Sequence, residues 1–260
     1  MSSREPGARL LGEGLAGRAA VCTGAAGGIG REVCAHLAAA GARVMAVDRD
    51  GSGCAAVIRE LPGSGHGWLA ADLSDVATAG TLPAVAQQRL GSFDILVHAA
   101  AVLRRQPLAE VTEADWDAQV GLNLKATFFL ARAAAEHLRR HGRAGRLVLL
   151  ASQAWWTGGY GGSAVYAASK AGVVSLVRGL AREYGPHGIT VNAVAPGSID
   201  TPMLRTGLSQ QVLDAIYAAT PLGRLGRAGE VAAACVFLAS DNASFITGTV
   251  LNVSGGWLTY

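Results

Sequence analysis

Ala19-Ala20-Val21-Cys22-Thr23-Gly24-Ala25-Ala26-Gly27-Gly28-Ile29-Gly30 is the stretch that decides the fold of this chain. An apolar run of strand length ends at Thr23, and a glycine-rich turn and an amphipathic helical pattern follow at once. Glycine lets backbone N–H groups approach a ligand, and a helix N-terminus attracts anions. A strand, a glycine loop and a helix in this order therefore predict a loop that binds the phosphates of a dinucleotide. Gly24, Gly28 and Gly30 fit one such spacing, and Gly24, Gly27 and Gly30 fit another.

The rest of the chain repeats this alternation of short apolar runs and amphipathic segments. The predicted strands cover residues 19–23, 43–47, 67–71, 95–99, 146–151, 190–195 and 249–253. Strands that are apolar throughout and separated by helices indicate a parallel sheet covered on both faces. The predicted fold class is α/β, a single doubly wound Rossmann domain with about seven parallel strands. It is expected to span residues 17–260, after a flexible N-terminal arm at residues 1–16.

Composition excludes several other classes of protein. The 260 residues are 50% hydrophobic and 16% charged, and they include 35 glycines without a collagen period. The net charge is +3, and the basic residues are scattered, which argues against a nucleic-acid partner. The sequence has no apolar run of membrane-spanning length, no N-terminal signal peptide, and no metal-ligand spacing among its four cysteines. We therefore expect a cytoplasmic protein with no membrane partner and no metal.

Asp48 ends the second predicted strand and bears on the choice of cofactor. It lies 18 residues beyond Gly30, close to the spacing of an acid that binds the adenosine ribose. Its carboxylate would bind both ribose hydroxyls and repel a 2′-phosphate, which favours NAD over NADP. Arg49 leaves an alternative open, because its guanidinium could receive that phosphate, and Asp48 could also be a simple turn residue. The glycine loop itself holds no basic residue, so the sequence predicts NAD.

Tyr166 and Lys170 are four residues apart at the start of a predicted helix and so share one face. The ordinary pKa of a tyrosine is about 10. A neighbouring ammonium would lower that pKa toward a useful range for acid–base catalysis. Ser152 ends the preceding strand, where its hydroxyl could hold a substrate oxygen. Asn123 belongs to another helix, and its amide could polarise a water or bridge to the lysine. None of the four residues is convincing alone, but together they favour an acid–base function for Tyr166.

With these motifs in this order from about residue 15 to the end, the chain resembles the short-chain dehydrogenase/reductase family, in its smaller single-domain branch. The resemblance implies that Asn123, Ser152, Tyr166 and Lys170 are catalytic. It implies hydride transfer between a nicotinamide and a secondary alcohol or ketone, and commonly a homotetramer. The implied cofactor contacts are Gly24, Gly28, Ile29, Gly30, Asp48, Arg49, Asp72, Leu73, Ala99, Tyr166, Lys170, Pro196, Gly197, Ile199 and Thr201.

The segment after the fourth predicted strand departs from the family pattern. The family usually carries Asn-Asn-Ala-Gly there, and this chain has His98-Ala99-Ala100-Ala101. The missing amides normally brace the sheet beside the cofactor, so the local support must differ. His98 invites a catalytic interpretation, but the favoured one is a buried, hydrogen-bonded histidine that replaces asparagine.

The substrate is expected to contact the loops above the sheet. Three aromatic residues lie among glycines in residues 153–162, and residues 198–217 form the expected lid. These features predict an apolar or cyclic small-molecule substrate, although Trp155 could instead pack in the core or at a subunit interface. Arg104 and Arg105 could meet an acidic substrate or carrier, but a solvated loop is the favoured interpretation. The predicted substrate contacts are Ser152, Trp155, Tyr160, Tyr166 and Met203.

The leading functional hypothesis is an NAD(H)-dependent oxidoreductase of secondary alcohols and ketones. A 3-oxoacyl-carrier-protein reductase is one alternative, and a non-catalytic NAD-binding regulator is an alternative of a different class. An enoyl reductase of similar fold would have a wider interval between tyrosine and lysine than the four residues found here.

Overall fold

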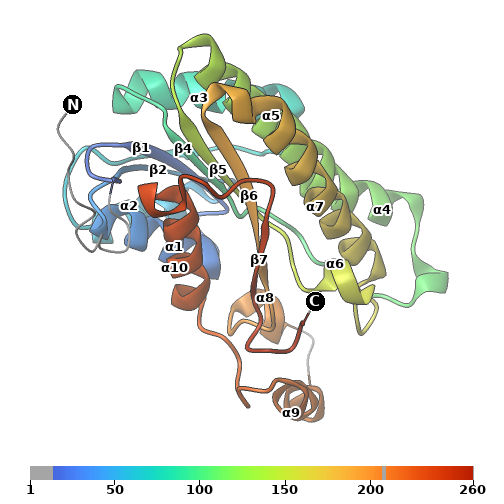
Figure 1. Ribbon diagram of the computed structural model, residues 1–260. Helices are drawn as coiled ribbons and strands as arrows, with labels where there is room; N and C mark the ends of the chain where they lie inside the picture. The colour runs from blue at the N-terminus through green and yellow to red at the C-terminus, as the bar shows by residue number, and fades with distance from the viewer. Residues whose placement is uncertain (1–13, 207–208, 260) are drawn as a thin grey trace.

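The computed structural model describes residues 14–206 and 209–259. Within these residues, seven strands form one parallel sheet in the order β3-β2-β1-β4-β5-β6-β7 (Figure 1). The strands are β1 (Ala19–Thr23), β2 (Arg43–Asp48), β3 (Gly67–Ala70), β4 (Ile95–His98), β5 (Gly145–Leu150), β6 (Ile189–Pro196) and β7 (Val250–Val253). All seven predicted strands are present, and no predicted end is displaced by more than one residue. The predicted α/β fold class is confirmed.

Helices connect the strands. The α-helices are α1 (Gly28–Ala39), α2 (Gly51–Glu60), α3 (Val76–Leu90), α4 (Glu113–Val120), α5 (Thr127–Arg140), α6 (Ala154–Thr157), α7 (Ala164–Tyr184), α8 (Pro202–Arg205), α9 (Gln210–Ala219) and α10 (Ala228–Ala239). A π-helical turn, η2 (Gly121–Ala126), joins α4 to α5. Short 3₁₀ turns are η1 (Leu108–Glu110), η3 (Gly185–His187) and η4 (Asp241–Ala243).

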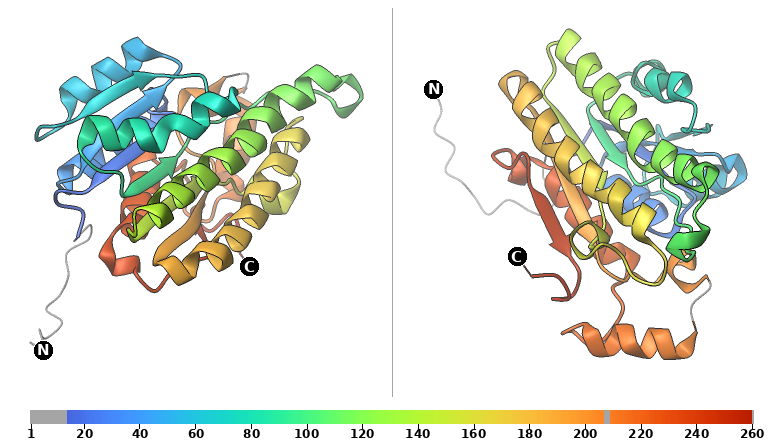
Figure 2. Two further views of the ribbon diagram at one scale, coloured as in Figure 1. Left: turned by 90° about the horizontal axis from the view of Figure 1, so that it is seen from above. Right: turned by 90° about the vertical axis from the view of Figure 1, so that its right-hand side faces the viewer.

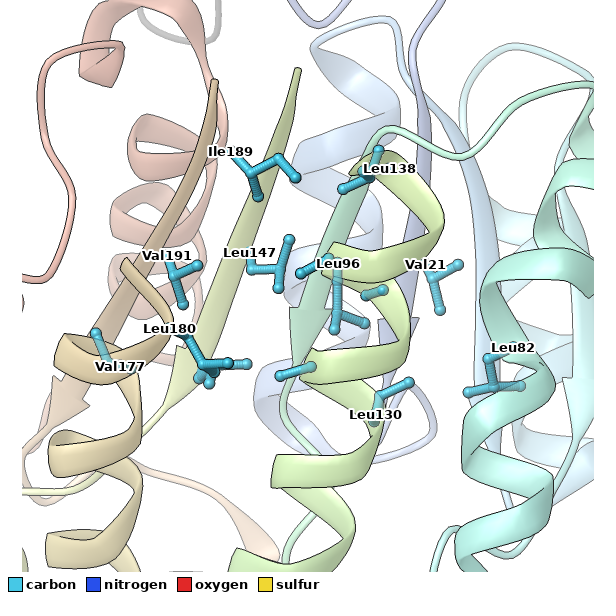
Figure 3. Packing of buried hydrophobic residues seen from close by; sticks show 14 of the residues in the cluster. Val21, Leu82, Leu96, Leu130, Leu138, Leu147, Val177, Leu180, Ile189 and Val191 are labelled. Atoms are coloured by element: carbon cyan, nitrogen blue, oxygen red, sulfur yellow. The ribbon is translucent and has the colours of Figure 1, made fainter. Parts of the chain in front are cut away.

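Two apolar layers cover the two faces of the sheet, because side chains alternate along each strand. Val21 packs in one layer with helices α3, α5 and α7, and Cys22 packs in the other with α1, α2 and α10 (Figure 1). Figure 3 shows Leu130 of α5 and Val177 of α7 in the first layer, together with Leu147 of β5. Burial of each such leucine side chain stabilises the folded protein by about 2 kcal/mol through the hydrophobic effect. The four cysteines are buried and unpaired.

Helices α8 and α9 lie outside these two layers. Figure 2 shows α9 at one end of the molecule, apart from the helices that pack on the sheet. They correspond to the lid expected at residues 198–217, of which residues 207 and 208 lie outside the described residues. Residues 1–13 of the expected N-terminal arm also lie outside them. In the ranges 14–206 and 209–259, no helix has both the length and the apolar character needed to cross a membrane. The predicted division into arm and domain stays a prediction.

Candidate active site

A cavity of about 760 Å³ opens beyond the carboxyl ends of the strands. Its lining includes the loop after β1 and the residue after β4. β1 and β4 are neighbours in the sheet, and the strands that follow each of them are added in opposite directions. Open α/β sheets bind their ligands at this switch point. The predicted site residues that line the cavity are Gly24, Gly28, Ile29, Gly30, Ala99, Ser152, Tyr160, Tyr166, Lys170, Pro196, Gly197, Ile199, Thr201 and Met203.

The glycine loop is as tight as its sequence implies. Gly24 has φ +68°, and a Cβ atom on it would lie 2.7 Å from the backbone nitrogen of Ala100. A Cβ atom on Gly30 would overlap the carbonyl oxygen of Gly24, and one on Gly28 would lie 2.8 Å from Cγ2 of Thr201. Gly27 has more room, since its nearest neighbour would be 3.2 Å away. Close packing therefore requires the Gly24, Gly28 and Gly30 set.

The N-terminus of α1 suits a pyrophosphate. Asp50 accepts a hydrogen bond from the amide of Gly53 at the start of α2, and Asp75 caps α3 in the same way. No side chain caps the first turn of α1, whose N-cap is Gly27. Its amide donors are therefore available to an anion, which the helix dipole also favours. A dinucleotide fits this end of the cavity.

Asp48 faces the glycine loop, although it is not part of the cavity lining. Its Oδ2 accepts a hydrogen bond from the amide of Ala26 (3.2 Å), and its Oδ1 accepts one from the amide of Asp50 (3.1 Å). These contacts hold the carboxylate beside the loop, where the ribose of a dinucleotide is expected. Arg49 is exposed.

Asp72 and Leu73 also lie outside the lining. Hydrogen bonds from Ser74 lower the pKa of Asp72, and the charge of Arg49 contributes in the same direction. The positive charge of Arg49 therefore lies near Asp72. The side chain of Leu73 is buried in the core. A cofactor contact at Leu73 would have to use its backbone.

Tyr166, Ser152 and Lys170 meet where the sequence predicts. Tyr166 and Lys170 project from the first turns of α7, and the hydroxyl of Ser152, two residues beyond β5, hydrogen-bonds that of Tyr166. Lys170 Nζ donates to the carbonyl oxygen of Leu150 (2.7 Å) and lies 5.7 Å from the centre of the Tyr166 ring. Burial lowers the pKa of Lys170 to about 8. The cavity thus holds a hydroxyl pair beside a buried amine.

The expected effect of Lys170 on Tyr166 is not what the structure shows. Burial raises the pKa of Tyr166 to about 12, and the opposing influences are the hydrogen bond with Ser152 and the charge of Arg105. The ammonium of Lys170 is directed to the Leu150 carbonyl instead of the phenol oxygen. Arg105 is therefore the cation that favours the phenolate in this structure.

Asn123 is fully buried in η2 and its side chain does not reach the cavity. Its Oδ1 accepts from the amide of Val102 (2.9 Å), and its Nδ2 donates to the carbonyl oxygen of Val102 (2.9 Å) and to Oγ of Ser169 (3.2 Å). The amide therefore fastens the segment after β4 to the helix that carries Tyr166 and Lys170. Its place in a proton relay stays a prediction.

His98 braces the sheet in place of the usual asparagine. Thr127 Oγ1 donates to the carbonyl oxygen of Asn123 (2.7 Å), so it must accept from His98 Nε2 (2.9 Å). His98 Nδ1 then accepts from Thr23 Oγ1 (2.7 Å). The ring is 3% exposed, and burial, followed by the charge of Lys170, lowers the pKa of His98 to about 3. A buried, neutral, hydrogen-bonded histidine is what the sequence favoured.

The aromatic residues of the predicted substrate loop separate into two groups. Tyr160 lines the cavity and packs edge-to-face against Trp257, with ring centres 5.5 Å apart. Trp155 does not line it, because its ring packs against the hydrophobic core. The structure therefore favours the core alternative for Trp155.

Several lining residues were not singled out from the sequence as substrate contacts. They include Leu103, Gln153, Val212, Ile216 and Trp257, and Arg105 was assigned to a solvated loop. The half-buried Arg105 in the cavity corrects that assignment. No pattern in the sequence marks Leu103, and Trp257 reaches the cavity only because the chain returns after β7.

Comparisons with known proteins agree with this architecture. Residues 24–258 match a family model described as enoyl-(acyl-carrier-protein) reductase. The 3-oxoacyl-[acyl-carrier-protein] reductase of Escherichia coli is 40% identical over 242 residues, which are 92% of this chain and 97% of that protein. A crystal structure of a short-chain dehydrogenase/reductase from Brucella melitensis, described as glucose/ribitol dehydrogenase, has a TM-score of 0.86 and 36% identity and covers 94% and 98% of the two chains.

The chain belongs to the short-chain dehydrogenase/reductase family. Another structure similar to this chain comes from Agrobacterium tumefaciens and carries the provisional name 2-deoxy-D-gluconate 3-dehydrogenase. It contains NADP, has a TM-score of 0.86 and 38% identity, and covers 94% and 97% of the two chains. As a short-chain dehydrogenase/reductase, this protein is an oxidoreductase of alcohol and carbonyl groups that uses a nicotinamide cofactor.

Proposed function

We propose that this protein is an NAD(H)-dependent enzyme that interconverts a secondary alcohol and a ketone, with Tyr166 as its acid–base group. The observation that carries the proposal is one cavity that joins the glycine loop to the hydrogen-bonded hydroxyls of Tyr166 and Ser152. A dinucleotide at the loop and a carbinol at the hydroxyl pair would then lie in a single chamber. The non-catalytic alternative gives no reason for this combination.

In the direction of oxidation, Ser152 holds the alcohol oxygen and the phenolate of Tyr166 removes its proton. As the O–H bond breaks, the C–O bond becomes double and the hydrogen on carbon leaves with its electron pair. The nicotinamide supplies the acceptor for that hydride. Reduction reverses the step, and the neutral phenol of Tyr166 donates the proton. Lys170, one turn along α7, is the residue proposed to hold the cofactor ribose.

The preference for NAD rests on Asp48. Its Oδ2 lies 3.2 Å from the Ala26 amide, and loop residues 23–30 contain no basic side chain to neutralise a 2′-phosphate. The NADP in the Agrobacterium tumefaciens structure is the reason to measure this preference directly. Titration of the protein with NADH and with NADPH, followed by nicotinamide fluorescence, is expected to give a dissociation constant about tenfold lower for NADH. Tighter binding of NADPH would reverse the proposal for Asp48.

Tyr166→Phe tests the proposed chemistry. It is expected to lower kcat for a panel of secondary alcohols and ketones by about a thousandfold, with NADH binding unchanged, because only the proton-transferring oxygen is removed. Tyr184→Phe is the matched control, since Tyr184 lies at the other end of α7 and its hydroxyl donates to Glu136 (3.0 Å). Turnover by Tyr166→Phe at the rate of the control would exclude Tyr166 as the acid–base group.

A ketoreductase of acyl thioesters is the second candidate, because the Escherichia coli relative is a 3-oxoacyl-[acyl-carrier-protein] reductase. The N-acetylcysteamine thioester of 3-oxobutyrate, included in the same panel, distinguishes the two substrate classes. Binding of the cofactor without turnover of any compound in the panel would favour the regulator. The homotetramer implied by the family stays a prediction, which light scattering of the purified protein can test.

A further inference from the structure

Residues 102–106 follow β4 without forming a helix or a strand, and their contacts alternate along the chain. Every second backbone amide donates a hydrogen bond: Val102 to Asn123 (2.9 Å), Arg104 to Gln119 (3.0 Å) and Gln106 to Gly162 (3.1 Å). The residues between them, Leu103 and Arg105, line the cavity. These three hydrogen bonds fix the backbone on either side of Leu103 and Arg105, whose side chains enter the cavity together. The backbone hydrogen bonds of Val102, Arg104 and Gln106 therefore hold the segment that places Arg105 in the cavity.

Arg104 and Arg105 are neighbours with opposite surroundings. The side chain of Arg104 is 52% exposed, and its Nη1 lies 2.8 Å from Oδ1 of Asp115. Arg105 is half-buried and forms no ion pair with any residue of the described ranges. Its Nη1 donates to the carbonyl oxygen of Thr206 (3.3 Å), which uses one of the five donors of a guanidinium. The charge of Arg104 is neutralised at the surface, and that of Arg105 is not.

The cavity around Arg105 offers no internal counterion. Among the described residues that line it, the cations are Arg105 and Lys170, and none is an aspartate or a glutamate. Apolar side chains such as Leu103, Leu204 and Ile216 make up much of the remaining wall. Burial lowers the pKa of Arg105, which reflects the loss of water around its charge. An unneutralised guanidinium in such a setting favours an anionic ligand, and the planar fork of arginine suits a carboxylate.

Arg105 is also near the reacting groups. Its charge and the phenol of Tyr166 influence each other, and both residues line the same cavity. A carboxylate bound by Arg105 and a carbinol held at Tyr166 would therefore occupy the same cavity. The phosphates of a carrier or coenzyme thioester are many bonds from the acyl carbon, so they do not fit this position.

We propose that Arg105 binds a carboxylate of the substrate, and that the enzyme interconverts hydroxy acids and oxo acids whose carboxylate lies close to the reacting carbon. The carboxylate would accept hydrogen bonds from the free guanidinium donors, and the apolar wall would contact the hydrocarbon part of the molecule. This inference rests on the proposed dehydrogenase function. It adds an anionic group to the apolar or cyclic substrate that the sequence predicts.

The test compares acids with neutral analogues of the same shape. The probes are 3-hydroxybutyrate with its methyl ester and amide, and 3-hydroxycyclohexanecarboxylate with its carboxamide, each assayed with NAD. In the wild-type protein, we expect kcat/KM to be about a hundredfold higher for each acid than for its neutral analogue, as a charge-assisted pair implies. The N-acetylcysteamine thioester of 3-hydroxybutyrate is the competing substrate.

Arg105→Met removes the charge and keeps an unbranched side chain. It is expected to lower the ratio of kcat/KM for each acid to that for its neutral analogue from about a hundred to about one. A loss shared equally by acids and neutral analogues reports only the influence of Arg105 on the Tyr166 phenol. Arg105→Lys should restore part of the ratio, because it returns the charge without the planar fork. Arg104→Met, the control, removes a neighbouring exposed charge and should leave all substrates unchanged. Thermal unfolding of each variant verifies folding.

A binding measurement separates this inference from the proposed function. Cyclohexanecarboxylate has no hydroxyl to oxidise, and calorimetry should show that it binds the NADH-loaded protein, that cyclohexanecarboxamide does not, and that Arg105→Met abolishes the difference. Three outcomes would overturn the inference and leave the proposed dehydrogenase function intact. They are turnover of neutral alcohols without a preference for acids, an acid preference that survives in Arg105→Met, and a preference for the thioester. If no alcohol is oxidised, the proposed function fails, and equal binding of the carboxylate and the carboxamide then overturns the inference as well.

Discussion

The glycine-loop end of the cavity and the aromatic end differ in where their residues come from. The glycine-loop end has Gly24, Gly28 and Gly30 in one turn of its lining. Asp48, at the end of the next strand, lies beside this loop and outside the lining. The aromatic end collects residues from four distant segments: Leu103 and Arg105, Ser152 and Tyr160, Met203 and Ile216, and Trp257. Short-range geometry governs the first end, and long-range packing governs the second. The difference explains why the residues of the glycine loop were easier to predict from the sequence than those that line the other end.

The junction between the two ends is formed by His98 and Asn123. His98 connects Thr23, just before the glycine loop, to Thr127 of α5. Asn123 connects Val102, just before Leu103, to Ser169 of α7. Both side chains lie below the cavity in buried positions. They hold the two ends in a fixed relation without contacting a ligand through the cavity lining.

Gly30→Ala is expected to have the largest effect, because its Cβ atom would overlap the carbonyl oxygen of Gly24. The clash with backbone should lower the affinity for NADH by more than about a hundredfold and the free energy of unfolding by about 4 kcal/mol. Gly27→Ala is the matched control in the same loop, with φ −78° and more room. NADH titration and urea unfolding measure both. Equal affinities in the two variants would mean that loop geometry does not decide cofactor binding.

His98→Asn tests the junction through the pH dependence of stability. The pKa of His98 is about 3 in the folded protein and about 6.5 in the unfolded chain, so the unfolded chain binds more protons between these values. The free energy of unfolding of the wild type should therefore fall as the pH is lowered from 6.5 toward 3. Between pH 7 and pH 4, we expect a loss about 3 kcal/mol greater than in His98→Asn.

Urea unfolding at several pH values measures this difference, and His187→Asn is the control because His187 is exposed. A wild-type stability curve that runs parallel to that of His98→Asn would contradict a neutral, buried imidazole at this position.

Trp257→Ala is expected to have the smallest effect and to act on the aromatic end alone. Loss of the ring that packs against Tyr160 should raise KM for a cyclic substrate about tenfold and leave NADH affinity unchanged. Trp116→Ala is the control, since Trp116 is exposed on α4 and does not line the cavity. Steady-state kinetics provide the measurement. A comparable loss of NADH affinity would mean that the two ends are not separable.

The fold was predictable from the sequence almost to the residue. Each strand is a short apolar run with a clear boundary, such as Asp48 after β2, and a buried parallel strand has to be apolar on both faces. Residues within one turn of each other were also predictable as partners. Tyr166 and Lys170 share a face of α7 because four residues make about one helical turn.

Contacts between distant segments required the tertiary structure. The favoured interpretation of Arg105 was a solvated loop, since an arginine next to another arginine has no pattern that distinguishes a surface charge from one in a cavity. Folding turned Arg104 toward Asp115 and Arg105 toward Tyr166. It also directed Lys170 to the Leu150 carbonyl, so that burial dominates the pKa of Tyr166.

The glycine loop illustrates the part that the amino-acid order decides alone, because its turn depends on backbone freedom at a few adjacent positions. The substrate chamber illustrates the opposite, because burial and charge at Arg105 or Trp257 depend on which segments the fold brings beside them. Local sequence therefore specified an α/β fold and a dinucleotide loop. Packing across the sheet decided which charge enters the cavity, since desolvation is a property of the whole surrounding structure and not of a residue's neighbours in the chain.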